Sequence, residues 1–570
     1  MRGPRPMLPL WLRGPGPTPG DEAPEATARM LRSWSVERLV LLVMAGLVLV
    51  GSLPFWHAVL IDRSLLEGST WRFLATTAVM LVGLHTLLVL LLATRRTVKP
   101  LLALMALCSL VGLHLMQEYG VVLDPPMLRN ALHTNVREAA ELLTPGLLLN
   151  LAGAGLVSWV LWRVPLRRRS WRRAASQRLM ALGGVLLVTV AALLLGFQDF
   201  GSLMRNQKAL RYRIAPGNIV YSASRAWWGD LRDARQQREP LLPLQTVAAM
   251  PAHKPRLLVI VVGETARAMN FELNGYPRPT NPQLSQLPVI NFRQTTSCGT
   301  STEVSLPCMF SPYGRADYDE DRIHNTESLP QLLSRAGLRV VWLDNQSGCK
   351  GVCDGLDARD LSKGQDPELC PKGHCFDDVL LKGLGQVVEE GERAGTAPRD
   401  TVVLLHQLGN HGPAYAERYP AAYARFSPAC HTSELRRCSQ EEIANAYDNA
   451  ILYTDHLLAD AVAQLRGYQE RYDVGLMYAS DHGESLGENG LYLHGMPQAI
   501  APREQLSVPM LWWFGGQGVS GWNGLDAACL RRRAAQPASH DNLFHSVLGL
   551  MGVRTSQYVG QRDLLSPCRV

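Results

Sequence analysis

The chain has 570 residues, 47% of them hydrophobic, and a formal net charge of +7. The charge is unevenly distributed, because residues 1–230 carry 25 Lys and Arg against 12 Asp and Glu, whereas the remainder is net negative. No nucleic-acid-binding module and no basic stripe with interleaved aromatic residues is present, so we expect no nucleic-acid partner. The positive charge instead indicates membrane topology.

The N-terminal third predicts a short tail followed by a membrane domain. Residues 1–36 are rich in Pro, Gly and Arg without an apolar period, and we expect a disordered tail or an over-extended translation start. Residues 37–199 predict five transmembrane helices, because most of their apolar stretches are long enough to cross a bilayer. The stretches are Leu39–Leu60, Phe73–Ala93, Leu101–Met116, Leu142–Val164 and Leu179–Phe197. The first lacks a small-residue cleavage site, so we expect it to be retained.

Basic residues predict the orientation of these spans. Arg95, Arg96 and Lys99 lie between the second and third stretches. Six arginines lie between the fourth and fifth, and a seventh, Arg163, lies at the end of the fourth. Positively charged loops stay in the cytoplasm. We therefore expect a cytoplasmic N-terminus in the inner membrane of a Gram-negative cell, with everything after Phe197 in the periplasm.

Residues 200–250 predict a bridging segment. The runs Leu203–Tyr212 and Ile219–Leu231 combine arginines with Trp227 and Trp228. Such residues favour amphipathic helices on a membrane face. A solvated linker is an equally good interpretation of the second half.

Residues 251–570 predict one α/β/α sandwich. Four apolar runs each end in polar residues: Leu257–Val262, Leu338–Leu343, Thr401–Leu405 and Val474–Ser480. Segments between them, such as Ser328–Ala336 and Glu441–Leu465, have the length of crossover helices, as a mostly parallel sheet requires. Their polar ends would then meet at one edge of the sheet, where α/β proteins place their sites.

Two of these ends carry metal-ligand chemistry. Asp481 and His482 follow the last run, and Glu264 follows the first. Zn²⁺ accepts such ligands. A cluster of hydroxyls in residues 295–308 offers a nucleophile, which a base or a metal must activate. A Ser/Thr-rich surface turn closed by a disulfide is the alternative interpretation.

Cysteine usage indicates an oxidising compartment, because ten of the eleven cysteines lie after Phe197. A zinc–thiolate site is disfavoured, since no matched CxxC pair occurs. Close spacing suggests the disulfides Cys298–Cys308, Cys349–Cys353, Cys370–Cys375 and Cys430–Cys438. Cys529 and Cys568 remain, and only elimination would pair them.

The sequence resembles the lipid A phosphoethanolamine transferases, a family that includes the mobile colistin-resistance enzymes and belongs to the alkaline phosphatase and sulfatase superfamily. The motifs GETAR, TSCGTSTEVSLPC, HQLGNHGPAY and SDHGESLGENGLYLHG carry the resemblance, which extends from about Glu37 onward. It implies that Thr302 is the nucleophile and that Glu264, Thr302, Asp481 and His482 are the Zn²⁺ ligands.

The resemblance also implies substrate-binding residues. His411 and His494 match histidines that contact the transferred phosphate, and Lys350 lies near a basic residue with a similar role. Asn130, Thr134 and Glu138 match a pattern that holds the donor's headgroup. Their spacing of four would place them on one face of a helix, although a solvated polar face has the same spacing.

The function that follows is transfer of phosphoethanolamine from phosphatidylethanolamine to a lipid A phosphate by a membrane-embedded enzyme that we expect to be a monomer. Thr302 would carry the group covalently, and the modification would weaken cationic peptides such as polymyxin. Alternatives are transfer to a core sugar or another envelope glycan, a phosphatase or sulfatase, or a non-enzymatic membrane receptor. No Cys-x-Pro-x-Arg sulfatase motif is present, and the complete ligand set disfavours the receptor.

Overall fold

The computed structural model describes residues 33–61, 63–134, 136–233, 238–242, 244–246, 254–364, 366–371, 375–393, 399–516, 522 and 524–569. The predicted tail, up to residue 32, and the predicted domain start at Pro251 lie outside the described residues. The chain forms two compact units. The first contains residues 1–113 and 149–217, and the second contains residues 114–148 and 218–570.

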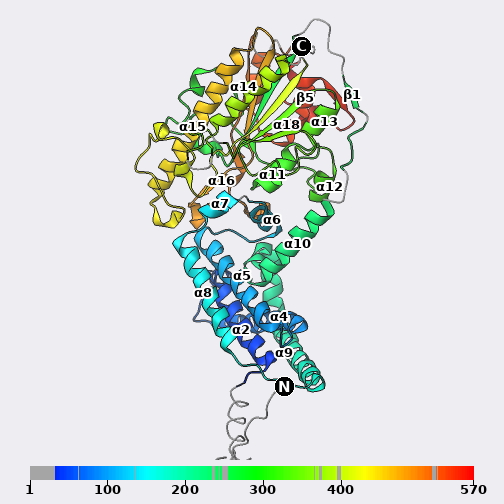
Figure 1. Ribbon diagram of the computed structural model, residues 1–570, viewed down its shortest axis with the longest axis vertical. Coiled ribbons are helices and arrows are strands. Elements are labelled where there is room, and N and C mark those ends of the chain that lie inside the picture. The colour runs from blue at the N-terminus through cyan, green and yellow to red at the C-terminus, as the bar shows by residue number, and fades with distance from the viewer. Residues whose placement is uncertain are drawn as a thin grey trace, which may run out of the picture. The chain divides into compact units, whose positions relative to one another are not determined.

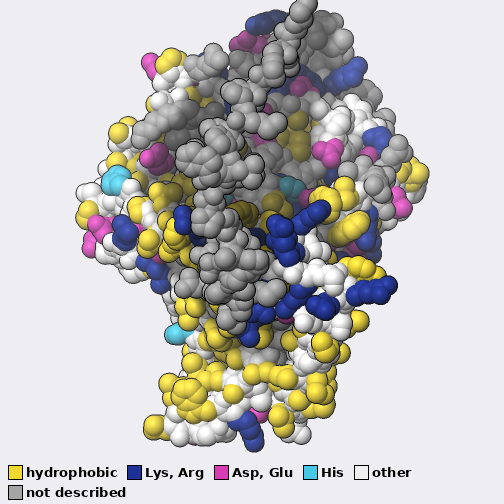
Figure 2. All heavy atoms as spheres, turned by 60° about the horizontal axis from the view of Figure 1, so that its bottom comes forward, with side chains coloured by type: hydrophobic (Ala, Val, Ile, Leu, Met, Phe, Trp, Pro, Cys, Tyr) yellow, Lys and Arg dark blue, Asp and Glu magenta, His cyan; other side chains and the backbone are white. Residues whose placement is uncertain are grey.

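The first unit is helical. Among the described residues, four helices are long and apolar enough to cross a membrane, and a fifth span is present if the bent pair α2 and α3 counts as one. The helices in this part of the chain are α2 Val36–Gly51, α3 Leu53–Leu60, α4 Gly68–Leu92, α5 Val98–Glu118, α8 Pro145–Arg163, α9 Trp171–Asn206 and the 3₁₀ helix η2 Lys208–Arg213. Large apolar side chains are exposed along them, and Figure 2 shows Lys and Arg side chains gathered beside such apolar surface. A lipid environment suits this surface.

Two helices differ from the predicted spans. The first predicted stretch is not one straight helix, because it breaks at Ser52 and bends by 55°. Pro54, just inside α3, cannot donate the backbone hydrogen bond that a continuous helix would need. The Ser52 hydroxyl also exchanges hydrogen bonds with the backbone of Ala215. Helix α9 continues to Asn206, beyond the predicted end of the fifth span at Phe197.

The second unit contains a seven-stranded, mostly parallel sheet in the order β3-β12-β8-β2-β7-β5-β6. Strands β8, β2, β7, β5 and β6 are parallel, and β12 is antiparallel to its neighbours. The four runs predicted as strands form β2, β5, β7 and β8. The bounds are β2 Arg256–Gly263, β3 Ile290–Asn291, β5 Arg339–Asp344, β6 Asp357–Asp360, β7 Thr401–His406, β8 Asp473–Ser480 and β12 Met510–Phe514.

Helices cover both faces of this sheet (Figure 1), as the predicted α/β/α sandwich requires. Helices α11, α13 and α18 lie on one face, and α14 and α15 lie on the other. Strand β2 is buried on both faces from Leu257 to Gly263, as expected for the centre of a parallel sheet. The bounds are α11 Thr302–Met309, α13 Leu329–Arg335, α14 Asp378–Arg393, α15 Gln440–Arg466, α17 Ala527–Ala534 and α18 Asp541–Met551.

Shorter elements complete the second unit. They are α6 Pro125–His133, α7 Val136–Glu141, α10 Gly217–Asp233, α12 Glu320–Asn325, α16 Arg503–Leu506, β1 Leu244–Thr246, β4 Thr295–Thr296, β9 Ser485–Leu486, β10 Tyr492–Leu493, β11 Ser507–Val508, β13 Ala538–Ser539 and β14 Val553–Thr555. The expectation that Asn130, Thr134 and Glu138 share one helix face is wrong. Helix α6 ends at His133 because the backbone of Thr134 is extended, with ψ 135°, and Glu138 belongs to a separate helix, α7.

Candidate metal and nucleophile site

The carboxyl ends of β2 and β8 place three candidate metal ligands together. Glu264 directly follows β2, and Asp481 and His482 directly follow β8, its neighbour in the sheet. One potential ligand atom from each residue lies within 4.8 Å of the others, and all three residues are buried. The ends of two adjacent parallel strands therefore bring the cluster together.

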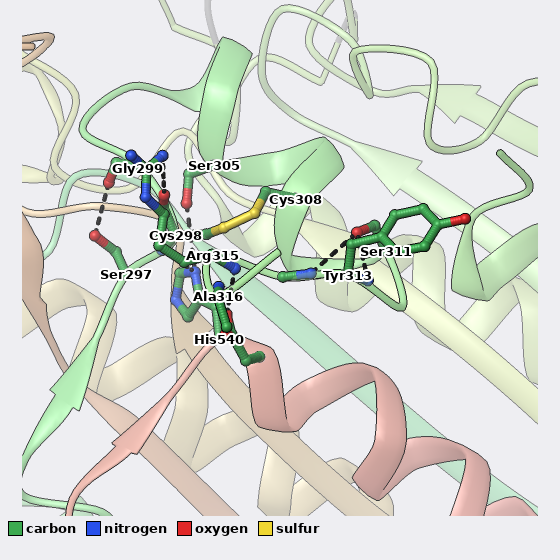
Figure 3. Close-up of a disulfide and its surroundings, with 12 residues drawn as sticks. Ser297, Cys298, Gly299, Ser305, Cys308, Ser311, Tyr313, Arg315, Ala316 and His540 are labelled. Atoms are coloured by element: carbon green, nitrogen blue, oxygen red, sulfur yellow. Dashed lines mark hydrogen bonds between the residues drawn. A yellow bond between two sulfur atoms is a disulfide. The ribbon is translucent and has the colours of Figure 1, made fainter. Parts of the chain in front are cut away.

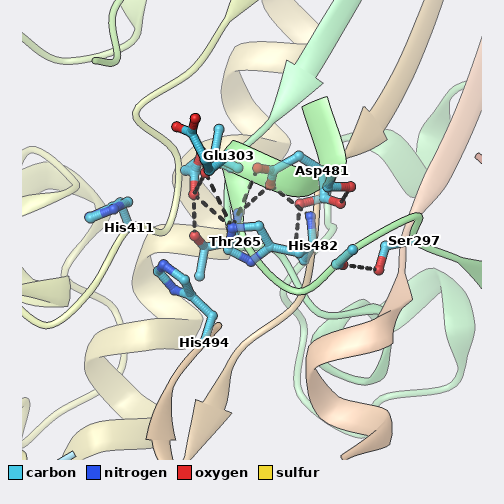
Figure 4. A network of polar contacts seen from close by, with 12 residues as sticks. Thr265, Ser297, Glu303, His411, Asp481, His482 and His494 are labelled. Carbon is cyan, nitrogen blue, oxygen red and sulfur yellow. Dashed lines mark hydrogen bonds and ion pairs between the residues drawn. The ribbon is translucent and has the colours of Figure 1, made fainter. Parts of the chain in front are cut away.

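The hydroxyl of Thr302 joins this cluster. Figure 4 shows the surrounding side chains, with Asp481, His482 and His494 labelled. Its Oγ1 lies 3.1 Å and 3.2 Å from the two carboxylate oxygens of Glu264 and 3.3 Å from Nε2 of His482. The four residues that the resemblance implied as ligands thus converge on one buried point.

The charges of the cluster suit a cation. Burial and the negative charge of Glu264 raise the pKa of Asp481 to about 7. Burial opposes ionisation of Glu264 too, but the hydrogen bond and charge of His482 outweigh it and hold the pKa of Glu264 well below its usual range. Oδ2 of Asp481 is buried and makes no hydrogen bond with any described residue. Two close carboxylates with an unused oxygen require a positive charge between them.

The nucleophile loop is closed on itself and is also joined to the metal-ligand loop. Thr302 begins α11, and the disulfide Cys298–Cys308 closes a sequence separation of 10 residues around it. Ser305 Oγ donates to the Asp481 carbonyl at 2.5 Å, which joins the two loops. His540 joins both loops, as Figure 3 shows from the disulfide's side. Its Nδ1 accepts from the Cys298 amide at 3.1 Å, and its Nε2 donates to the Ser480 carbonyl at 2.9 Å. Burial lowers the pKa of His540 to about 4, which keeps the ring neutral for both contacts.

The two predicted phosphate-contacting histidines lie beside the cluster. The ring of His494 is 4.4 Å from that of His482 and 5.5 Å from that of His411, measured between centroids. Nδ1 of His494 is 2.8 Å from Glu484 Oε2, and Tyr415 Oη donates to Glu484 Oε1 at 2.5 Å. Burial lowers the pKa of His494 to about 3 and raises that of Glu484 to about 8. Because Glu484 occupies Nδ1, the other ring nitrogen of His494 remains for a substrate.

Glu303, the residue after Thr302, holds a group of cations. Its buried carboxylate lies 3.2 Å from Nδ1 of His133, 3.8 Å from Nε of Arg129 and 4.0 Å from Nζ of Lys350. Burial raises the pKa of Glu303, but the hydrogen bond with His133 and the charges of Lys350 and Arg129 give a net lowering. Glu303 therefore links helix α6, the nucleophile helix and the predicted substrate-binding lysine.

A cavity of about 1110 Å³ opens near the site. Thr134 and Glu138 line it together with Gln346, whose amide donates to Glu264 Oε2 at 3.0 Å. Glu138 also lies 3.9 Å from Nε2 of His411. Lys350 and Asn130 do not appear in this lining. The structure thus brings Thr134 and Glu138 to the cavity, Lys350 to Glu303, and Asn130 to neither.

Several residues of the site were not identified from the sequence. Gln346 follows the singled-out end of β5, and Glu484 lies within the metal-ligand motif, so position alone could have identified both. His540 contacts Ser480 and Cys298, 60 and 242 residues away, and Glu303 contacts His133, 170 residues away, so only the fold reveals their roles. All four predicted disulfides are present, and Cys529 pairs with Cys568.

Two family descriptions match the chain. Residues 81–230 match "Phosphoethanolamine transferase EptA/EptB", and residues 256–553 match the sulfatase family. The matched ranges correspond to the helical part with its loop and to the sheet domain that carries Glu264, Thr302, Asp481 and His482.

Individual proteins give the same result. Phosphoethanolamine transferase EptA of Salmonella typhimurium is 40% identical over 467 residues, 79% of this chain and 82% of that protein. Phosphatidylethanolamine transferase Mcr-1 of Escherichia coli is 39% identical over 457 residues, 77% of this chain and 83% of that protein. The solved structure of the integral membrane lipooligosaccharide phosphoethanolamine transferase A from Neisseria meningitidis matches with a TM-score of 0.85 and 35% identity, covering 92% of this chain and 98% of that one. The chain therefore belongs to the membrane-bound phosphoethanolamine transferase family of EptA and Mcr-1.

Proposed function

We propose that this phosphoethanolamine transferase is Zn²⁺-dependent, takes its group from phosphatidylethanolamine and passes it to a lipid A phosphate through a covalent intermediate on Thr302. The observation that carries the proposal is the position of Thr302 Oγ1, a hydroxyl placed among buried metal-type ligands. A hydroxyl in such a place is activated for attack on phosphorus.

The first half-reaction transfers the group to the enzyme. A bond forms between Thr302 Oγ1 and the donor phosphorus, and the bond from phosphorus to the diacylglycerol oxygen breaks. Thr302 loses its hydroxyl proton, and diacylglycerol gains a proton. Glu264, Asp481, His482 and Thr302 would hold Zn²⁺, which would lower the pKa of a bound hydroxyl and stabilise charge on phosphate oxygens.

His411 and His494 bind the phosphate oxygens or carry protons in both half-reactions. Their rings lie beside His482, and Glu484 fixes the orientation of His494. In the second half-reaction an oxygen of the acceptor phosphate attacks the same phosphorus, and the bond to Thr302 Oγ1 breaks. The two histidines can serve both steps because proton transfer reverses direction between them.

Thr134 and Glu138 hold the donor's headgroup. Both line the large cavity, and a carboxylate is a suitable partner for an ethanolamine ammonium. Lys350 acts outside this lining, on the phosphate side, where Glu303 holds its ammonium near the nucleophile helix. Asn130 acts through Thr134, whose hydroxyl donates to the Asn130 carbonyl. The lining also contains the acidic residues Glu141, Asp344, Asp360 and Glu417 against the basic residues Lys363 and Arg418, so its net charge is negative and suits a cationic headgroup.

We keep the predicted division into domains as part of the proposal: tail 1–36, a five-span membrane domain 37–199, a bridging segment 200–250 and a periplasmic catalytic domain 251–570. The bent pair α2 and α3 supplies the first span. Trp227 and Trp228 on α10 are 60% and 64% exposed, which supports contact of this helix with a membrane face. The enzyme works as a monomer in the inner membrane.

The acceptor is tested by mass spectrometry of lipopolysaccharide from cells that express the wild type or Thr302→Ala. We expect lipid A to gain the mass of one phosphoethanolamine with the wild type only, together with a higher polymyxin tolerance. Unmodified lipid A with a modified core sugar would favour the alternative glycan acceptor. Loss of donor lipid without any modified glycan would instead indicate a phosphatase.

A further inference from the structure

The helical unit contains a second cavity, of about 250 Å³, where helices α2 and α9 begin and α4 ends. Its lining is strongly basic: Arg95, Arg167, Arg169 and Arg178 surround it, with Glu37 as the one carboxylate among the described lining residues. One carboxylate neutralises one guanidinium, so the cavity keeps a net positive charge. It plays no part in the transfer site, which belongs to the other unit.

The arginines of this cavity are held in position. Arg178 donates from Nη1 to the carbonyls of Leu90, at 2.8 Å, and of Ala93, at the end of α4. Its Nε lies 3.6 Å from Glu37 and makes no hydrogen bond with a described residue. Arg169 Nη1 lies 3.3 Å from Glu37. Guanidinium groups that are already ordered lose little conformational entropy when an anion binds.

Two further features indicate what the anion is attached to. The first turns of α2 and α9 contribute to the lining, and the N-terminal ends of helices attract negative charge. Apolar side chains beside the cavity are exposed: Leu91 by 68%, Leu92 by 69% and Leu179 by 69%. A basic cavity next to exposed leucines fits a charged group that is joined to hydrocarbon chains.

We propose that this cavity binds the phosphate headgroup of an anionic phospholipid, with the acyl chains lying along Leu91, Leu92 and Leu179. Basic pockets between transmembrane helices bind such headgroups. The volume is below the roughly 300–1,000 Å³ of pockets that enclose a drug-sized ligand, so it accommodates a headgroup and leaves the chains in the bilayer. The bound lipid would join the ends of α2, α4 and α9. It is distinct from the zwitterionic donor.

The test compares the full-length wild type with two charge-matched double variants in detergent. Arg169→Gln with Arg178→Gln removes cavity arginines, whereas Arg168→Gln with Arg172→Gln removes arginines of the same loop and helix that do not line the cavity. Native mass spectrometry then measures binding of phosphatidylglycerol, phosphatidylethanolamine and inorganic phosphate. We expect the cavity variant alone to bind phosphatidylglycerol more weakly, on the order of tenfold.

Equal weakening in both double variants would show general surface electrostatics and overturn the proposal. Binding of phosphatidylethanolamine as tight as that of phosphatidylglycerol would also overturn it. Equally tight binding of inorganic phosphate would overturn it too, because it would identify a free-anion site. Glu37→Gln gives a test that does not depend on the folding of the arginine variants, because it keeps every cavity arginine. It removes the carboxylate that competes with the lipid phosphate, so this variant should bind phosphatidylglycerol more tightly than the wild type. Weaker binding would contradict the assignment.

Discussion

Glu303 shows how much of this site depends on one residue beside the nucleophile. It faces His133, Arg129 and Lys350 at 3.2 to 4.0 Å while almost fully buried. Removing the charge leaves Arg129 and His133 with Asp230 but takes away the carboxylate that Lys350 faces. Breaking a buried pair costs about 3–5 kcal/mol. Glu303 is therefore a positioning residue for Lys350 and for helix α6.

We expect Glu303→Gln to lower kcat/KM for phosphatidylethanolamine by roughly 10- to 100-fold, because Gln keeps a hydrogen-bond acceptor for His133 but cannot hold the Lys350 ammonium. Initial rates at several donor concentrations, at equal metal content, measure this. Glu303→Asp, which keeps the charge, should recover part of the loss. Equal kcat/KM in the wild type and Glu303→Gln would refute the positioning role.

Among individual residues, the metal-type ligands were identified from the sequence because they follow strands directly. Glu264, Asp481 and His482 needed only the rule that parallel strands end at one edge. Thr302 needed the family resemblance to be selected from several hydroxyls. His540 could not be predicted, because its role depends on hydrogen bonds to Cys298 and Ser480, far away in the sequence.

At the scale of elements, the nucleophile loop is held by a disulfide whose contribution should be local. Cys298–Cys308 closes a separation of 10 residues next to Thr302, whereas Cys529–Cys568 closes 39 residues elsewhere. The chain-entropy account assigns more stability to the longer loop. Loss of the longer loop's disulfide should therefore lower stability more, whereas loss of Cys298–Cys308 should lower activity more.

We expect loss of Cys298–Cys308 by paired Cys→Ser changes to reduce the transfer rate more than loss of Cys529–Cys568, although the latter lowers the melting temperature more. Transfer rates at equal amounts of folded protein, with melting curves for both variants, make the comparison. Parallel losses of activity and stability would mean that the first disulfide does not position Thr302.

Helix α7 offers a second test at this scale. Glu138→Ala should raise KM for phosphatidylethanolamine and leave bound Zn²⁺ unchanged, because Glu138 lines the cavity 3.9 Å from His411 and is not a member of the metal-type cluster. Donor titrations and elemental analysis of the purified variant measure both quantities. An unchanged KM would remove the ammonium-binding role.

Strands and crossover helices were predictable because buried parallel strands are continuous apolar runs, and β2, β5, β7 and β8 match their predicted ranges closely. Breaks within helical segments were not predictable from the sequence. The bend at Ser52 coincides with hydrogen bonds to Ala215, and α6 ends where the backbone of Thr134 becomes extended. Hydrophobic periodicity indicates neither break.

At the scale of the whole molecule, the division of charge predicts orientation. A reporter that is active only in the periplasm should work after Val570 and fail after Arg168, because the arginines between α8 and α9 hold that loop in the cytoplasm. Alkaline phosphatase fusions at the two positions test this, with protein levels compared by immunoblot. Activity at Arg168 would contradict the five-span topology.

The sequence predicted two units, but not which segments of the chain belong to each. The loop 114–148 lies between predicted spans, yet it belongs to the compact unit of the catalytic domain. Hydropathy shows only where helices cross a membrane. Contacts such as those of Arg129 and His133 with Glu303 join the loop to that unit.

The central claim is that Thr302 carries the transferred group. Intact-mass analysis of the full-length enzyme after incubation with phosphatidylethanolamine, without acceptor, tests it most directly. The account predicts one added phosphoethanolamine on the wild type, removed when acceptor is supplied, and no addition to Thr302→Ala. An adduct that persists in Thr302→Ala, carried by Thr300 or Ser301, would contradict it.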